Sequence, residues 1–515
     1  MTGATPVVVR TWATVVEMLA AAATEAPDAE ALVFGDRRLT YATYLACVAG
    51  FARELDALGA RDDRVATLIG NSIEACVAAF AALAAGAQHV PLNPQYTARE
   101  LGPILADAAP VVLVVDAAMA PMAEPVARRA GVRHVIVVGE RARRLDTWRA
   151  AEVTLPPPPD AQALALLQYT GGTTGGAKGV DLTHGAIAIN VAQRDALLPS
   201  RPGDRILCMM PLSHAYGMAM GLFLAAHCAG TLVILSRYLP DEVFAAIQRE
   251  RIGVFPGSPT VFVGLMSHPD FARTDWRSVH TCYSGAAPLA AATLERWRDA
   301  VGAPVYEGYG MTEAGPVLSF NPSGRPARPG SVGVALPLTD LEIVDVESGR
   351  QVLPVGTCGE VRARGPQCMR GYRNRPDETA LALRDGWLYT GDIGELDAEG
   401  YLYIRDRKKD MAIVGGYNVY PREVEEVLFE HPDVADAAVV GAPDAYRGEV
   451  LVAHVVLRAG ASADAGSLLA HCRANLAKYK VPTRVRLAAA LPKTAVNKSD
   501  KNALRRLGAT DSPAA

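Results

Sequence analysis

The sequence lacks several features that would assign it to a class at once. Its 515 residues carry a net charge of -4, so no excess of basic side chains points to a nucleic-acid partner. The eight cysteines form no C-x-x-C pair and no histidine-rich spacing, which argues against a zinc site or a disulfide framework. Scattered cysteines are typical of free buried thiols in a reducing compartment, so a cytoplasmic protein is expected.

A long uninterrupted apolar run is also lacking. The alanine-rich stretch ACVAAFAALAAGA (75–87) is too short to span a bilayer and is expected to form a buried helix. Near the N-terminus, Arg10 and Glu17 interrupt the apolar residues, and this predicts a helix rather than a signal peptide. No integral membrane segment is therefore expected.

Apolar strand-like runs alternate with helical stretches through most of the chain. The rhythm is clearest in RVATLIG, SIEACVAAFAALAAG and HVPLN, and again in VVLVVD, AMAPMAEPVARRAG and HVIVVG. It predicts an α/β fold with mostly parallel sheets. From Leu341 short strands and turns predict a β-barrel-like part, and after YLYIRDRKKD (401–410) a compact α+β unit follows. We expect a large N-terminal domain of stacked α/β layers with a β-barrel-like subdomain (1–408) and a small C-terminal α+β domain (409–515).

One stretch stands out for its glycines: LLQYTGGTTGGAKGVDLTH (166–184). Glycines let backbone N–H groups approach a ligand closely, and hydroxyls and a lysine suit a polyphosphate. The common nucleotide loop carries a hydroxyl directly after its lysine and opens a helix, whereas Gly179 follows Lys178 here. Extended residues on both sides predict a turn between two strands. A mobile surface turn is the alternative interpretation.

Further clusters of polar and small residues lie downstream. Tyr309 could stack on a base, Asp392 could hold ribose hydroxyls, and Glu313 could offer an oxygen ligand to Mg²⁺. Taken singly, they could equally be a core aromatic, a turn-forming aspartate and a solvated carboxylate. The clusters are SGAAPL (284–289), VYEGYGMTEAG (305–315), DGWLYTGDIG (385–394), RDRKKDMAIVGGYNVYPREVEE (405–426) and LPKTAVNKSDKNALRR (491–506).

Taken in order, these motifs together with PLSHAYG (211–217) resemble the adenylate-forming superfamily. That group includes acyl-CoA and aryl-CoA synthetases, peptide-synthetase adenylation domains and beetle luciferases. The resemblance runs from about residue 30 to 507 and is closest in texture to bacterial medium- and long-chain fatty-acyl-CoA ligases. It implies that a carboxylate attacks the α-phosphate of ATP, giving an acyl-adenylate and pyrophosphate, and that a thiol then releases AMP. The C-terminal domain would be a mobile lid.

The resemblance also implies roles for individual residues. Lys498 would bridge the substrate carboxylate and the α-phosphate, His214 would lie where the acyl and pantetheine sites meet, and Lys409 would be the hinge. Thr173 and Glu313 would hold Mg²⁺. The nucleotide would contact Thr170, Gly171, Gly172, Thr173, Thr174, Gly175, Lys178, Gly285, Ala286, Ala287, Glu307, Gly308, Tyr309, Gly310, Met311, Thr312, Asp392, Ile404, Arg407 and Lys498.

Two departures from the family pattern are visible. Asn497 stands where glycine usually precedes the catalytic lysine, and asparagine tolerates positive φ better than most residues. Lys493 and Lys501 lie nearby, but the spacing from PKT favours Lys498. The small-residue turn reads SGAAPL where two glycines are common, which is a mild change.

The expected substrates follow from the same resemblance. No acidic residue stands beside His214 to hold an α-amino group, and VFPGSPTVF (254–262), Tyr283 and Gly308 offer a small or apolar pocket wall. A fatty or other apolar acid is therefore expected, with ATP and coenzyme A as the other small-molecule partners. No carrier domain follows the last motif, which favours free CoA as the acceptor. The alternatives are a ligase that loads a separate carrier protein and a degenerate, non-catalytic nucleotide-binding homologue. A homodimer is compatible with these expectations.

Overall fold

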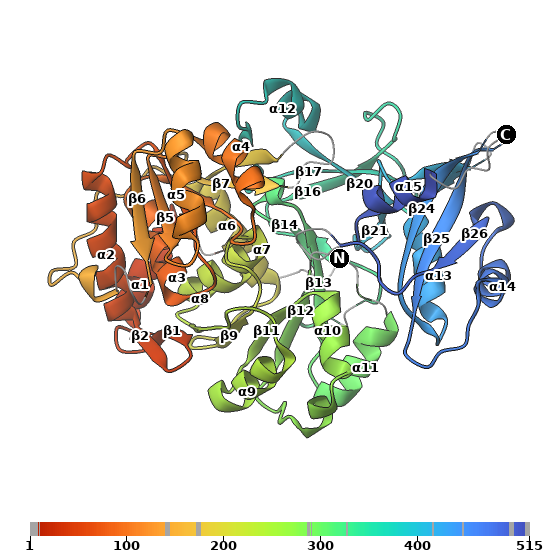
Figure 1. The fold of residues 1–515 in the computed structure, drawn as a ribbon, viewed down its shortest axis with the longest axis horizontal. Coiled ribbons are helices and arrows are strands. Elements are labelled where there is room, and N and C mark those ends of the chain that lie inside the picture. The colour runs from red at the N-terminus through yellow and green to blue at the C-terminus, as the bar shows by residue number, and fades with distance from the viewer. Residues whose placement is uncertain are drawn as a thin grey trace, which may run out of the picture. The chain divides into compact units, whose positions relative to one another are not determined.

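The computed structural model describes residues 9, 11–139, 145–170, 177–285, 289, 291–325, 328–414, 417–444, 447–493 and 499–509. Contacts divide the chain into two compact units. The first contains Met1–Asp340 and Ala363–Leu388, and the second contains Leu341–Arg362 and Tyr389–Ala515. The fold is the expected α/β type, with a large N-terminal and a smaller C-terminal part (Figure 1).

The first unit is built on two sheets. In the nine-stranded sheet the middle strands run parallel and the edge strands run antiparallel. Its order is β15 (Val334–Ala335), β14 (Val317–Phe320), β13 (Val305–Gly310), β12 (Thr281–Ser284), β11 (Val254–Gly257), β9 (Arg205–Cys208), β10 (Thr231–Ile234), β1 (Glu30–Phe34) and β2 (Arg37–Thr40). The seven-stranded sheet has the order β18 (Gly371–Tyr372), β8 (Lys178–Thr183), β7 (Leu164–Thr170), β4 (Gln88–Pro91), β3 (Arg64–Leu68), β5 (Val112–Asp116) and β6 (His134–Val138).

Helices connect the parallel strands, as the alternating pattern predicts. Helix α3 begins after Ser72, whose hydroxyl accepts a hydrogen bond from Ala75 N at 3.2 Å and so caps the helix. Every residue of α3 except Ala75 is buried, which confirms the expected buried helix. The longer helices of this unit are α1 (Val15–Glu25), α2 (Tyr41–Ala57), α3 (Ile73–Ala84), α4 (Ala98–Ala108), α5 (Ala120–Arg129), α6 (His184–Leu197), α9 (Pro240–Glu250), α10 (Pro259–Met266) and α11 (Ala291–Val301).

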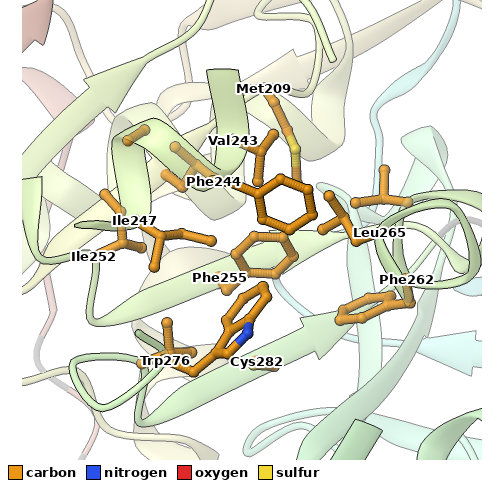
Figure 2. Close-up of a cluster of buried hydrophobic side chains, with 14 of the residues drawn as sticks. Met209, Val243, Phe244, Ile247, Ile252, Phe255, Phe262, Leu265, Trp276 and Cys282 are labelled. Carbon is orange, nitrogen blue, oxygen red and sulfur yellow. The ribbon is translucent and has the colours of Figure 1, made fainter. Parts of the chain in front are cut away.

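Aromatic rings pack the core beneath the nine-stranded sheet. The rings of Phe244, Phe255, Phe262 and Trp276 gather against strands β11 and β12 (Figure 2). Trp297 of α11 lies 4.7 Å from Phe262, centroid to centroid, in an edge-to-face arrangement that aromatic quadrupoles favour. This packing fixes the carboxyl ends of β12 and β13, where several of the expected site residues lie.

The second unit contains the main strands of a third sheet and the whole of a fourth. The third comprises β16 (Asp340–Val344), β17 (Gly359–Arg364), β20 (Trp387–Leu396), β19 (Leu383–Arg384) and β21 (Leu402–Arg407). The fourth comprises β23 (Tyr417–Val419), β22 (Ala412–Val414), β25 (Gly448–Leu457), β24 (Val434–Asp444) and β26 (Arg484–Leu487). Helices α13 (Pro421–Glu430), α14 (Ala465–Asn475) and α15 (Lys501–Ala509) complete the unit.

The barrel-like strands thus cluster with the C-terminal residues rather than with the N-terminal ones. Compactness and hinge position are separate properties, so the functional boundary at residue 408 stays a prediction. All eight cysteines are free, as expected. Within the described residues, the helices are each too short or too polar to cross a bilayer.

Candidate active site

The glycine-rich loop joins two antiparallel strands. Thr170, the last residue of β7, pairs with Lys178, the first residue of β8, and its Oγ1 lies 3.5 Å from the Lys178 carbonyl oxygen. This confirms the two predicted strands on either side of the loop, whose residues 171–176 lie outside the described ones. The pairing fixes Thr170 and Lys178 side by side at the base of the loop, so both can reach one anion held above it.

A carboxylate and a lysine meet around one tyrosine in this unit. The Tyr372 hydroxyl donates a hydrogen bond to Glu313 Oε1 at 2.8 Å, and Lys178 Nζ lies 5.2 Å from the centre of the same ring. Burial, reinforced by the Glu313 charge, raises the pKa of Tyr372, so the phenol stays protonated and donates. Glu313 is 8% exposed. A buried carboxylate of this kind suits a hard cation such as Mg²⁺.

The carboxyl ends of β12 and β13 lie side by side. A Cβ at Gly285 would meet the Tyr216 ring at 2.8 Å, and one at Gly308 would collide with the Phe320 ring, so both positions require glycine. Glu307 is 5% exposed, and its Oε1 accepts a hydrogen bond from Leu289 N at 3.0 Å. Its carboxylate therefore anchors the chain that follows β12.

The rest of the YGMTE motif follows directly. Tyr309 and Gly310 end β13 and pair with Ser319 and Val317 of β14. Met311 leads into a single 3₁₀ turn, Thr312–Ala314, which presents Thr312 and Glu313 one after the other. Parallel sheets bind ligands at the carboxyl ends of their strands, and this is the end at which Tyr309, Gly310, Met311 and Thr312 lie.

The PLSHAYG segment is held from both sides. Asn71 Oδ1 accepts a hydrogen bond from Leu212 N at 2.8 Å, and Gln168 Nε2 donates to Ser213 O at 2.9 Å. His214 Nδ1 accepts from Tyr216 N at 3.2 Å, which leaves the proton of the neutral ring on Nε2. Nε2 is therefore the atom that His214 could present as a donor.

The second unit holds a carboxylate with a different kind of neighbour. Asp392 of β20 pairs with Arg407 of β21 across the third sheet, and Arg407 Nε lies 3.5 Å from Asp392 Oδ1. The Arg407 side chain is 54% exposed, so it can reach a ligand as well. Ile404, two residues from Asp406 on the same strand, pairs with Gly394. The structure brings Asp392, Ile404 and Arg407 onto one pair of strands.

Lys409 lies between two anchored residues. On one side, Lys408 Nζ binds Glu360 Oε2 and Val346 O, each at 2.9 Å, which ties it to the third sheet. On the other side, Asp410 Oδ1 binds Arg505 Nη2 of α15 at 2.6 Å. Lys409 itself is exposed. Whether Lys409 acts as the hinge stays a prediction.

Several of the predicted site residues lie outside the described residues. These are Gly171, Gly172, Thr173, Thr174 and Gly175 of the loop, Ala286 and Ala287 of the small-residue turn, and Lys498. Their predicted roles stay predictions.

Sequence reasoning missed Tyr372 and Glu378. Tyr372 lies on β18, which pairs with β8, and Glu378 lies in the short helix α12 (Pro376–Ala382). Glu378 forms an ion pair with Lys178. A signal was present in GYRNRPDETA (371–380), where proline and two acids mark a helix start. Only the fold, however, shows that this helix lies beside the loop lysine.

Comparison with known proteins agrees with this geometry. The AMP-binding enzyme family matches residues 19–373, and the C-terminal domain of AMP-binding enzymes matches residues 423–498. The chain is 35% identical over 520 residues to a long-chain-fatty-acid–CoA ligase of Bacillus subtilis, covering 94% of this chain and 93% of the relative. It is 38% identical over 482 residues to a feruloyl-CoA synthase of Amycolatopsis, covering 93% and 96%.

A solved structure has a similar fold. ATP-bound MatB from Rhodopseudomonas palustris superposes with a TM-score of 0.89 at 32% identity, covering 96% of this chain and 98% of that one. Matches of this extent, with both parts of the chain represented, identify the fold and its chemistry together. The chain belongs to the AMP-binding enzyme family, the adenylate-forming enzymes, and within it to the AMP-forming acyl-CoA synthetases.

Proposed function

We propose that the protein is an ATP-dependent ligase that joins an apolar carboxylic acid to coenzyme A. In the first half-reaction the acid attacks the α-phosphate, giving an acyl-adenylate and pyrophosphate. In the second, the thiol of CoA attacks the acyl carbon and AMP leaves. The observation that carries this proposal is the meeting of Lys178 and Glu313 around Tyr372, because a fixed cation beside a buried carboxylate suits a magnesium-bound polyphosphate.

The residues of the first unit would bind the triphosphate and the base. Thr170 and Lys178, with Thr173 and Thr174 of the loop, would hold the phosphates, and Thr312 would contact the α-phosphate. Tyr309, Gly285 and Ala286 would frame the adenine. Glu313 and Thr173 would hold Mg²⁺, which supplies charge neutralisation on the phosphate oxygens when bound.

The residues of the second unit would complete the reaction. Asp392 would accept hydrogen bonds from the ribose hydroxyls while Arg407 holds the carboxylate in place. Lys498 would stabilise the negative charge that develops between the acid and the α-phosphate. Lys409, between its two anchored neighbours, would act as the pivot between the half-reactions.

The acid pocket is proposed to be apolar. Tyr283 is fully buried, and its hydroxyl already donates to Met220 O at 2.6 Å, so it offers no free donor to a substrate. The Phe320 ring lies against Gly308. Phe255 and Phe262 belong to the aromatic core next to the proposed pocket wall. Relatives named for long-chain fatty acids and for a feruloyl group support an aliphatic or aromatic acid alike. Their names as CoA ligases and a CoA synthase favour CoA over a carrier protein as the acceptor.

The test is magnesium-dependent pyrophosphate release across a panel of fatty, aromatic and α-amino acids, followed by thioester formation with CoA or with a purified carrier protein. Release with fatty or aromatic acids, and thioester formation with CoA, are expected. Glu313→Gln should lower the adenylation rate about a hundredfold and raise the Mg²⁺ concentration needed for half-maximal rate. Pyrophosphate release only with α-amino acids would contradict the proposed substrate class, and an undiminished rate in Glu313→Gln would contradict the magnesium role.

A further inference from the structure

Lys178 is paired with a carboxylate of the protein itself. Its ammonium forms an ion pair with the carboxylate of Glu378 on α12 while lying over the ring of Tyr372. Lys178, the lysine proposed to bind phosphate, therefore has an ion-pair partner within the protein. It is bound at a defined place by a residue 200 positions further along the chain.

The position of Glu378 is built into the fold. Strand β18 pairs with β8, and Arg373 N donates to Gly179 O at 2.8 Å, next to Lys178. Helix α12 is tied to the same strand, because Tyr372 N donates to the hydroxyl of Thr379 at 2.9 Å. The strand pairing and the hydrogen bond to the Thr379 side chain thus place the carboxylate beside the ammonium.

Carboxylate and phosphate oxygens make the same kind of bond to a lysine. Phosphate oxygens that approach the same ammonium bring negative charge close to the Glu378 carboxylate, and the repulsion between the two anions favours displacement of the carboxylate. The pair is open to such an exchange, since the Lys178 and Glu378 side chains are 27% and 33% exposed. A second cation is at hand for the released carboxylate, because Arg375 Nη1 lies 3.9 Å from Glu378 Oε1.

We propose that Glu378 is a positioning residue of the nucleotide site. It holds Lys178 at the base of the loop before the nucleotide arrives, and it gives the ammonium up to the phosphates of ATP. The inference rests on the proposed function, in which Lys178 binds those phosphates. One ion pair replaces another, so Glu378 weakens the binding of ATP and leaves the chemical step unchanged.

The experiment measures the dissociation constant of Mg-ATP by calorimetry, together with kcat and KM for ATP, in the full-length protein. Glu378→Gln keeps the shape of the side chain and removes its charge. Its dissociation constant should fall about two- to fivefold, the range expected for losing a partly exposed ion pair, with kcat unchanged. A residue that only stabilised the fold would not tighten binding when replaced.

Two matched variants make the outcome specific. Asp377→Asn removes the same charge from the neighbouring, exposed position and should leave the dissociation constant as in the wild type. In a Lys178→Gln background, Glu378→Gln should give no further gain, because the effect acts through Lys178. Equal or weaker binding in Glu378→Gln overturns the inference, and so does equal tightening in Asp377→Asn. A wild-type protein that binds no ATP at all removes the proposed function and this inference with it.

Discussion

Glu313 in the first unit lies in a 3₁₀ turn and Asp392 in the second lies within strand β20, and the surroundings of the two carboxylates differ as well. Glu313 is buried and accepts a hydrogen bond from a neutral phenol. Asp392 faces the guanidinium of Arg407 at 3.5 Å, which offsets its charge. The first environment suits a metal cation, and the second suits the neutral hydroxyls of a sugar. The neighbour of a carboxylate, more than the carboxylate itself, therefore indicates its ligand.

The same contrast extends to the two units. We expect the first to supply groups that bind the triphosphate and the second to supply groups that act on it and then move. Substitutions in the second unit should therefore separate the two half-reactions.

The largest effect is expected from Lys498→Ala. Loss of a charge that stabilises the transition state should slow acyl-adenylate formation about 100- to 1,000-fold. Conversion of presynthesised acyl-adenylate and CoA to thioester should continue near the wild-type rate. The matched control is Lys493→Ala, since Lys493 Nζ pairs with Asp436 at 2.6 Å and has no proposed role in the reaction. Equal loss in both half-reactions would show that Lys498 does not act in adenylation alone.

The next effect concerns the pivot. Proline at Lys409 fixes φ, so thioester formation should fall about a hundredfold while much of the adenylation rate remains. Lys409→Ala removes the same side chain but leaves φ free, and it should keep both rates. Pyrophosphate release and thioester yield, measured for both variants, decide between them. Equal slowing by alanine and proline would mean that the ammonium matters rather than the rotation.

A smaller effect is expected from Asp392→Asn. Weaker hydrogen bonds to the ribose should raise KM for ATP about tenfold, with a minor change in kcat. Wild type and variant should converge when the ribose hydroxyls are absent, as in 2′,3′-dideoxy-ATP. A difference that persists with this analogue would mean that Asp392 acts elsewhere.

The smallest effect concerns the stability of the first unit alone. Glu250 has a 3% exposed side chain and binds Arg38, Arg205 and Arg249 at 2.9, 2.6 and 2.9 Å. The Arg38 hydrogen bonds, chiefly, lower the pKa of Glu250 to about 2. Glu250→Gln should lower the free energy of unfolding by about 1–2 kcal/mol at pH 7.

The pH dependence of that difference has a definite sign. A carboxylate whose pKa is lower in the folded protein stabilises the fold fully above its ordinary pKa of 4.5. The contribution is lost as the pH falls toward the folded value of about 2. Melting temperatures of wild type and Glu250→Gln should therefore differ at pH 7 and converge in acid. A constant difference across this range would contradict the assignment to the charge of Glu250.

Local pattern was enough to predict the α/β layers, the buried helix α3 and the two strands on either side of the glycine-rich loop. Each depends on residues close in sequence, such as the extended runs on either side of Thr170 and Lys178. The motif order was enough to identify the family.

The contact between Tyr372 and Glu313 could not be predicted, because the two residues lie 59 positions apart. It depends on β18, a two-residue strand with no periodicity to reveal it. The ion pair of Lys178 with Glu378 depends on the same pairing. Such contacts follow from tertiary pairing, which a single sequence does not display.

The eight free cysteines have a consequence for an enzyme whose second substrate is itself a thiol. Burial raises the pKa of each one, to about 12 for Cys208, Cys228 and Cys282 and to about 11 for Cys47, Cys358, Cys368 and Cys472, with Cys76 also well above its ordinary value. Only a thiolate attacks a disulfide. A raised pKa leaves few of these thiols ionised at neutral pH. The disulfide of oxidised CoA should therefore react with them only slowly to form mixed disulfides.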